Sequence, residues 1–278
     1  MPTTQKQKAE AFAKLHTGPG AFIIPNPWDA GTARMLTALG YEALATTSAG
    51  FAFSLGRRDG EGLVSREEVL QHARAIIAAT DLPVAADLEN GFGDAPEAAA
   101  ETIGLAAEAG LVGGSIEDAT GNATQPIYPH TQAVERVAAA VEAARALPFR
   151  FTLTARAENF LHGKPDLDDT IRRLQAFAAA GADVVFAPGL STLDVVKTVC
   201  AAVAPTPVNV LASNWSADLS LADMAAAGVR RVSIGSGLSR IALAGFWNAA
   251  REMKDQGTFT FTRLALPFAQ VNDLMQGR

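Results

Sequence analysis

Polar and apolar positions follow a repeated unit along the chain. Four times, an alanine-rich amphipathic stretch ends at a glycine and runs directly into a short apolar segment. Glycine at this place predicts the left-handed end of a helix, which costs a residue without Cβ little. The four glycines are Gly40, Gly110, Gly181 and Gly228. The apolar segments are rich in Val, Ile and Ala without strict alternation, which is typical of strands buried on both faces of a parallel sheet.

Helix starts are marked by serines followed three residues later by an acid. This pattern places Ser65, Ser191 and Ser220 as N-caps, because the hydroxyl and the carboxylate can each accept a free backbone N–H. Strands and helices alternate without a linker-like segment. The strands are predicted near residues 21–25, 43–47, 84–87, 112–117, 151–155, 183–187, 207–211 and 231–234.

This order predicts an α/β fold with one domain over residues 1–278, a (β/α)₈ barrel of the TIM type. A doubly wound open sheet is the competing architecture. Residues 240–278 are more apolar than one closing helix needs. We expect them to form a helical segment that packs on a neighbouring subunit, and the alternative is a helix that folds back on its own barrel.

Composition narrows the function. The chain has 278 residues, 49% of them hydrophobic, so we expect a globular protein with a large core. Its net charge is −6, so we expect no nucleic-acid partner. Cys200 is the single cysteine, which excludes an internal disulfide and a thiolate-rich metal site. The N-terminal stretch has no apolar core of a signal peptide and no apolar run has spanning length, so a cytoplasmic location without a membrane partner is expected.

Acidic residues gather where the predicted strands end. "PVAADLENGFGD" places Asp87 and Glu89 directly after a strand, and Asp59 and Glu117 follow neighbouring strands. Barrel enzymes carry their chemistry at these strand ends, and carboxylates at this density repel one another unless a cation neutralises them. Mg²⁺ or Mn²⁺ suits such oxygen ligands. In an extended segment the side chains of Asp87 and Glu89 would also lean the same way.

The alternative is that these acids only form turns and caps; Asp94, for instance, could cap the helix that Pro96 opens.

Other candidates would contact the substrate. The segment "TTSAGFAFSLG" is expected to form a loop whose small residues could present backbone N–H groups to a carboxylate or an enolate oxygen; they are Ser48, Ala49 and Gly50. Arg156 suits a substrate carboxylate or, alternatively, a salt bridge to the acids. Asn209 is a further substrate-binding candidate, and His162 is either a proton donor or a solvated loop residue.

Several phrases together resemble the isocitrate lyase/phosphoenolpyruvate mutase superfamily, in particular its smaller members. They are "TTSAGFAFSLGRRDG", "DLENGFGD", "IED", "TARAENFL", "DLDDTIRRLQAFAAAGAD" and "RVSIGSG". The resemblance implies a barrel whose last helix is exchanged in a homodimer or homotetramer. It implies Mg²⁺ or Mn²⁺ held by Asp87, with Glu89, Asp59 and Glu117 reaching the ion directly or through water. It also implies a 2-oxo or 2-hydroxy acid bound by Arg156 and the amides near Ala49, with Arg156, Asp59 and Glu117 as the catalytic group.

The chain departs from the superfamily in one loop. Isocitrate and methylisocitrate lyases have a "KKCGH"-type gating loop with an acidic cysteine, whereas this chain has "ATGNATQPIYPH". Cys200 lies in a predicted helix away from the strand ends, where we expect a buried small hydrophobic residue. We therefore expect neither of those two activities. Mutases keep an aromatic residue where this chain has Thr46, and a histidine where it has Ala187 and Pro188, which argues against mutase activity.

The sequence therefore predicts a Mg²⁺- or Mn²⁺-dependent carbon–carbon lyase. It would act on a small 2-oxo or 2-hydroxy dicarboxylic acid through a pyruvate-type enolate, as in the decarboxylation of oxaloacetate. One alternative is P–C bond chemistry of the phosphonopyruvate hydrolase or mutase kind. Another is a metal-dependent protein that binds 2-oxo acids without turnover.

Overall fold

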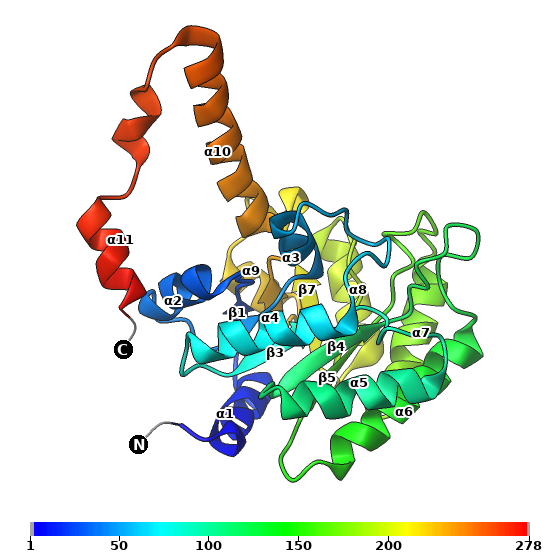
Figure 1. Ribbon diagram of the computed structural model, residues 1–278. Helices are drawn as coiled ribbons and strands as arrows, with labels where there is room; N and C mark the ends of the chain where they lie inside the picture. Colours follow the sequence, from blue (N-terminus) through cyan, green and yellow to red (C-terminus); the bar gives the residue numbers. More distant parts are fainter. Residues whose placement is uncertain (1–2, 277–278) are drawn as a thin grey trace.

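A computed structural model describes residues 3–276, and eight parallel strands surrounded by helices form a nearly closed barrel (Figure 1). The first and last strands in the chain pair with each other, which excludes an open doubly wound sheet: Phe22 of β1 lies opposite Arg231 of β8. The predicted (β/α)₈ fold is confirmed. The strands are β1 (Phe22–Ile24), β2 (Leu44–Ala45), β3 (Val84–Asp87), β4 (Gly113–Glu117), β5 (Thr152–Arg156), β6 (Val184–Phe186), β7 (Val208–Leu211) and β8 (Arg231–Ser233).

The helices begin and end largely where the sequence predicts. Ser65 and Ser220 are N-caps with complete capping boxes, and all four predicted glycines have φ between +84° and +104°. The prediction for Ser191 is wrong, because Thr192 accepts the capping N–H instead. The helices around the barrel are α1 (Gln5–Thr17), α2 (Ala30–Ala38), α3 (Ser48–Ser54), α4 (Arg66–Ala78), α5 (Pro96–Glu108), α6 (His130–Ala146), α7 (Leu167–Ala179), α8 (Leu193–Val203) and α9 (Leu221–Ala226).

Residues alternate between the two faces of each strand. In β5, Leu153 and Ala155 pack outward in the hydrophobic layer between strands and helices. Thr154 and Arg156 point into the barrel and line a cavity there. The same alternation holds in β8, where Val232 packs outward. Because side chains change face with period two, the polar residues of these strands are delivered to the barrel interior.

One side chain completes the barrel between β1 and β2. One backbone hydrogen bond joins them, from Ala45 N in β2 to the carbonyl of Pro25, the residue after β1, and it is 3.1 Å long. Asn26 lies beside it and donates from Nδ2 to the carbonyls of Ala45 and Thr46 at 3.1 and 3.0 Å. Its Oδ1 accepts from the amides of Ile234 and Gly235, each at 2.9 Å. Asn26 therefore joins β1, β2 and the end of β8.

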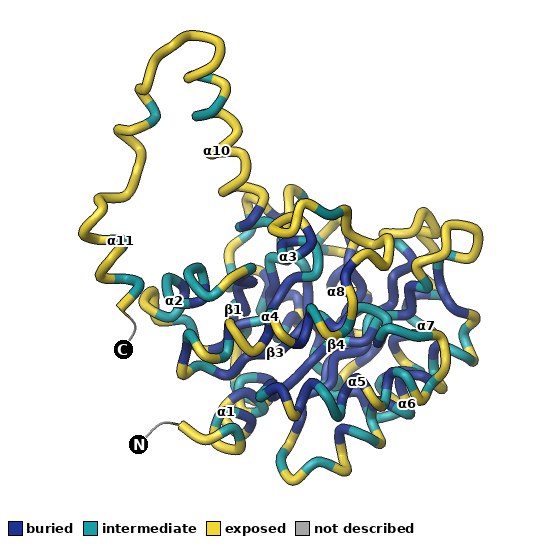
Figure 2. The backbone as a smooth tube through the Cα atoms, viewed as in Figure 1, coloured by how far each residue is buried: buried dark blue, intermediate teal, exposed yellow. Residues whose placement is uncertain are grey.

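The C-terminal segment leaves the barrel as an arm. Helix α10 (Gly237–Gln256) projects away, the 3₁₀ turn η2 (Thr260–Leu264) follows, and α11 (Phe268–Met275) returns to pack against α2. Figure 2 shows nearly the whole arm exposed, and its apolar side chains include Phe246, Trp247 and Phe268 at 71%, 63% and 83% exposure. The expected packing of residues 240–278 on a neighbouring subunit stays a prediction. No helix in residues 3–276 is both long and apolar enough to cross a membrane.

Candidate active site

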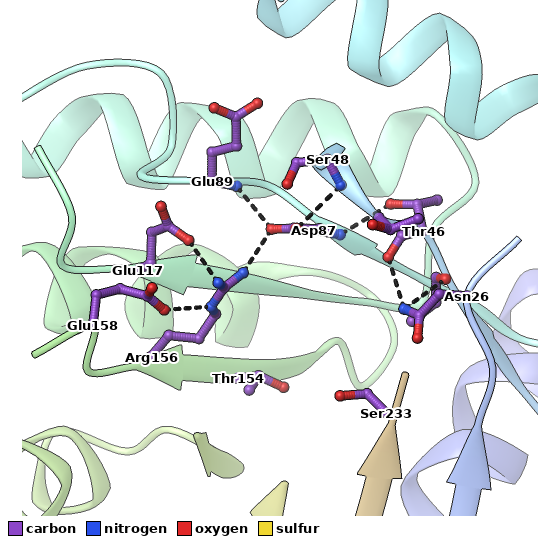
Figure 3. Close-up of polar contacts among 12 residues, drawn as sticks. Asn26, Thr46, Ser48, Asp87, Glu89, Glu117, Thr154, Arg156, Glu158 and Ser233 are labelled. Carbon is purple, nitrogen blue, oxygen red and sulfur yellow. Dashed lines mark hydrogen bonds and ion pairs between the residues drawn. The ribbon is translucent and has the colours of Figure 1, made fainter. Parts of the chain in front are cut away.

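Strand ends bring the predicted acids to the C-terminal mouth of the barrel. Asp87 ends β3, Glu117 ends β4 and Arg156 ends β5. The strand register places Glu117 beside Arg156. Asp87 is held by three N–H groups: its carboxylate accepts from the amides of Ser48 and Glu89 at 3.2 and 3.3 Å and from Arg156 Nη1 at 2.9 Å. Asp87 is therefore fixed at the centre of the mouth (Figure 3).

Arg156 binds three carboxylates at once. Besides Asp87, its Nη2 lies 3.0 Å from Glu117 Oε2 and its Nε lies 2.9 Å from Glu158 Oε1. Figure 3 shows the guanidinium between them. The salt-bridge alternative is thus present in this structure, and the guanidinium also faces the cavities in which a substrate would lie.

Burial makes ionisation of the acids around Arg156 costly. Burial raises the pKa of Glu117 well above its usual range, and neighbouring carboxylates add to the effect against the opposing pull of Arg156. Burial also raises the pKa of Glu158. For Arg156, burial alone would lower the pKa, but the surrounding carboxylates raise it further. The arginine stays charged, and an additional cation would stabilise the ionised acids.

Glu89 and Asp59 complete the acidic group. Glu89 has a φ of 48°, so the segment is not extended, and its side chain points away from Asp87 (Figure 3). The expectation that the two would lean the same way is wrong, because the left-handed residue turns the chain between them. Burial and the charges of Asp87 and Asp59 raise the pKa of Glu89 to about 7. Partial loss of water and the charge of Asp87 raise the pKa of Asp59, although this residue remains exposed.

Two adjoining cavities contain these groups. The outer cavity, of about 790 Å³, lies in the mouth and is lined by Glu89, Glu117 and His162. The deeper cavity, of about 180 Å³, lies inside the barrel and is lined by Asp87, Ala49 and Asn209. Ser48, Asp59, Arg156 and Leu161 line both. All nine predicted site residues except Gly50 therefore reach this one region.

The expected loop at Ser48, Ala49 and Gly50 is instead the first turn of helix α3. Thr47 caps this helix, and its hydroxyl accepts from the amide of Gly50 at 3.3 Å. Gly50 faces away from the cavity, because an added Cβ would lie 2.6 Å from Thr47 Cγ2 and 3.1 Å from Trp28 Cβ. The need for glycine there comes from packing, whereas Ser48 and Ala49 line the deep cavity.

The donor set fits a hard divalent cation. Its oxygens belong to carboxylates, the ligands that Mg²⁺ and Mn²⁺ prefer. Burial and neighbouring carboxylates raise the pKa values of Glu89 and Glu117, so a bound cation would stabilise their ionised forms. No three His, Cys, Asp or Glu side chains in residues 3–276 already converge as ligands of one ion. Mg²⁺ is usually bound by one or two carboxylates and keeps several waters.

Comparison with known proteins identifies the family. The profile described as phosphoenolpyruvate phosphomutase matches residues 12–254. The chain belongs to this family, within the isocitrate lyase/phosphoenolpyruvate mutase superfamily. It is 32% identical over 246 residues to an uncharacterised protein of Mycobacterium tuberculosis, covering 88% of this chain and 89% of that one. A crystal structure of a putative lyase/mutase from Burkholderia cenocepacia is 60% identical, with a TM-score of 0.93 over 97% of this chain and 95% of that chain.

Other members of the superfamily carry more specific names. A probable 2-methylisocitrate lyase of Corynebacterium glutamicum is 30% identical over 190 residues, which is 66% of this chain and 60% of the relative. A structure of oxaloacetate acetylhydrolase with oxalate has the same fold, with a TM-score of 0.86 at 22% identity over 98% of this chain and 95% of that chain. These relatives do not fix one reaction for this chain.

The loop after β4, where the sequence departs from the gating loop of the lyases, folds back on itself. Ala119 forms a bridge with Ile127, and Tyr128 donates a 2.6 Å hydrogen bond to Asp94. The prediction that Asp94 caps α5 is wrong, because Ala95 occupies that position and makes no side-chain cap.

Cys200 lies in α8, and burial raises the pKa of its thiol to about 11. The expected buried cysteine is confirmed.

Sequence reasoning missed residues that only the fold brings to the site. Glu158 accepts a hydrogen bond from Arg156 Nε at 2.9 Å, and its place two residues after a strand-end arginine was the available signal. Arg231 lines the deep cavity, and its signal was an arginine inside a buried apolar strand. Asn209, which sequence analysis did select, donates to Ser233 and accepts from Arg231.

Proposed function

We propose that the protein is a Mg²⁺- or Mn²⁺-dependent carbon–carbon lyase for a small 2-oxo or 2-hydroxy dicarboxylic acid, with decarboxylation of oxaloacetate as the first candidate. The observation that carries this proposal is the meeting of Asp59, Asp87, Glu89 and Glu117 with Arg156 at two adjoining cavities. A negatively charged substrate could enter such a site only if a cation offsets the acids.

Asp87 would be the principal ligand of the cation, with Asp59, Glu89 and Glu117 reaching it directly or through water. When bound, the cation would polarise the 2-oxo group and stabilise negative charge on its oxygen. Arg156 would keep the acids ionised and would orient the carboxylate next to the 2-oxo group. The small residues Ser48 and Ala49 leave room for the substrate in the deep cavity.

The chemical step would break the bond between C3 and C4 of oxaloacetate. Its electron pair would move into the 2-oxo group to give the enolate of pyruvate, while the C4 carboxylate leaves as CO₂. Solvent would then protonate C3. The polar groups fixed around the cavity would stabilise charge that develops during bond cleavage, which is how such sites lower a barrier.

Pyruvate release from a panel of acids tests this function. We expect oxaloacetate or a related 2-oxo or 2-hydroxy dicarboxylate to yield pyruvate with Mg²⁺ or Mn²⁺ and not with EDTA. 2-Methylisocitrate belongs in the panel, because the absence of a cysteine in residues 119–130 predicts no turnover of it. A protein that binds these acids without converting any of them would be a binding protein, and the lyase assignment would be wrong.

P–C chemistry is the second candidate because the matching family is that of phosphoenolpyruvate phosphomutase. Phosphonopyruvate in the same panel distinguishes the two. Inorganic phosphate and pyruvate as products would indicate hydrolysis of the P–C bond, and phosphoenolpyruvate would indicate isomerisation.

Removal of the proposed metal ligand gives an independent test. Mg²⁺ that binds only the folded protein raises its melting temperature by mass action. We expect Asp87→Ala to lose this response and any turnover, while Asp94→Ala, in a neighbouring acid bound to Tyr128, keeps the response. An equal Mg²⁺ response in wild type and Asp87→Ala would show that Asp87 is not the ligand.

A further inference from the structure

The floor of the deep cavity is formed around a buried arginine. Arg231 starts β8 and is 7% exposed. Its Nε donates to Asn209 Oδ1 at 2.8 Å, its Nη2 donates to Thr154 Oγ1 at 2.9 Å, and its Nη1 lies 3.2 Å from His16 Nε2. All three partners are neutral acceptors, because His16 is uncharged when its Nε2 accepts this bond. One N–H on each terminal nitrogen remains after these three bonds.

This arginine differs from the others at the two cavities. Arg66 pairs with Glu101 at 2.8 Å, and Arg156 pairs with three carboxylates. Among the ion pairs of residues 3–276 none involves Arg231, and burial alone lowers its pKa to about 9. A buried charge without a counter-ion is costly, so an arginine kept in this state is suited to receive an anion.

The guanidinium lies beneath the proposed reaction centre. Thr154, which it contacts, precedes Arg156 by two residues on the inner face of β5, and two residues along a strand span about 7 Å. The cavity between these levels is lined by polar side chains, among them Ser115 and Ser233. The loop over the mouth offers no alternative anchor, because residues 119–129 contain no lysine or arginine.

We propose that Arg231, assisted by Asn209 and Ser233, binds the second carboxylate of the substrate inside the barrel. This inference rests on the proposed function, since it assumes that the 2-oxo end lies at the acids and Arg156. It makes Arg231 the residue that selects dicarboxylates over monocarboxylates. The substrate would then be oriented with its second acid group toward the barrel floor, away from the loop at the mouth.

Calorimetric titration with two probes in the presence of Mg²⁺ tests the inference. Oxalate imitates only the 2-oxo carboxylate end of the substrate. 3,3-Difluorooxaloacetate, an inhibitor bound in a structure of oxaloacetate acetylhydrolase, also carries the distal carboxylate that Arg231 would bind. For Arg231→Met we expect oxalate affinity within about twofold of wild type and difluorooxaloacetate affinity lower by roughly 10- to 100-fold, the range of one or two charge-assisted bonds.

A second variant, Asn209→Asp, provides the same test if Arg231→Met fails to fold. It keeps Arg231 but places a carboxylate against it, and should cause the same selective loss. Arg230→Met is the matched control, because Arg230 is the neighbouring arginine and donates to Gly20 O outside the two cavities. It should bind both probes as wild type does.

The outcomes separate the two proposals. Equal loss of both probes, or no loss of difluorooxaloacetate affinity in Arg231→Met and Asn209→Asp, would overturn the role of Arg231 and leave the lyase proposal intact. A wild-type protein that binds neither probe with Mg²⁺ would overturn the proposed function, and the inference about Arg231 with it.

Discussion

A single guanidinium organises the acids of the mouth. Arg156 reaches Asp87, Glu117 and Glu158 with three different nitrogens, so the planar fork of arginine is used on three sides. An ammonium group is a compact charge that cannot satisfy the same three partners in these positions. The arginine is therefore a support for the proposed metal ligands as well as a candidate contact of the substrate.

Arg156→Lys should weaken both functions although it keeps the charge. We expect kcat/KM to fall by the equivalent of about 2–4 kcal/mol, the cost of losing charge-assisted bonds in a buried site. Separate titrations of Mg²⁺ and of substrate check this expectation. A change confined to the substrate would make Arg156 only an anchor, and a change confined to Mg²⁺ would make it only a support of the acids.

For single residues, the sequence predicts which side chains gather at the strand ends, whereas their pairing depends on the fold. Asp87, Glu117 and Arg156 could be selected because each ends a strand. The turn of Glu89 away from Asp87 could not be predicted, because a positive φ in a residue with a Cβ is set by the surrounding chain. Glu158 was overlooked because it follows the end of β5, where the direction of a side chain depends on the path of the chain beyond the strand.

Helix α1 covers the closed end of the barrel through a buried histidine. His16 lies in this helix, and only 5% of it is exposed. Its Nδ1 lies 2.8 Å from Phe12 O, and since a carbonyl only accepts, Nδ1 carries the proton and Nε2 accepts from Arg231. Protonation would place a second charge beside this arginine.

This arrangement predicts an acid-sensitive contribution to stability. Burial, followed by the charge of Arg231, lowers the pKa of His16 to about 3 from 6.5. The unfolded chain therefore binds more protons than the folded one between these values, and the free energy of unfolding falls as pH decreases through that window. The slope from this group is up to about 1.4 kcal/mol per pH unit.

Urea unfolding of wild type and His16→Gln at pH 7.5 and pH 5.5 measures the effect. Glutamine can keep the two hydrogen bonds but does not titrate, so the variant should lose less stability over this interval. Equal losses would show that His16 does not remain neutral in the folded protein.

Helix α8 contains a thiol that the proposed chemistry does not need. Cys200 is 7% exposed and packs near Gly228. Cys200→Ala should leave kcat/KM within about twofold, with a small loss of stability from the smaller side chain. Rapid inactivation of the wild type by iodoacetamide, with protection by substrate, would contradict the assignment of Cys200 as a buried apolar residue.

Element predictions succeed where a local pattern fixes the structure. The glycine ends and serine caps depend on neighbouring residues only, and strands such as β3 and β4 lie within a residue of the predicted ranges. Helix α3 was expected as a loop because "TTSAGFAFS" is short and has small residues. Its formation depends on Thr47 as cap and on packing of Gly50 against Trp28.

The whole molecule exposes an apolar arm that is unusual for an isolated chain. Side chains of α10 and the following segment remain in solvent, with Ile241 67% and Leu264 88% exposed. Contiguous apolar surface of this kind marks an interaction site. We expect the arm to be covered by another copy of the chain, as the family resemblance implies.

Light scattering at micromolar concentration should therefore give the mass of a dimer or tetramer. Phe246→Asp together with Trp247→Asp should shift the mass toward the monomer, because buried charges without partners oppose association. A wild-type monomer at that concentration would exclude the exchanged arrangement.

The position of Asn26 between β1 and β2 has a consequence for the chemical lifetime of the protein. Asn26 binds four backbone groups there, and deamidation to aspartate would replace the donor that meets the carbonyls of Ala45 and Thr46 with an acceptor. The usual route begins with attack by the next backbone nitrogen on the side-chain amide. That residue is Pro27, whose nitrogen has no N–H to lose, so the asparagine on which barrel closure depends is protected from this form of ageing.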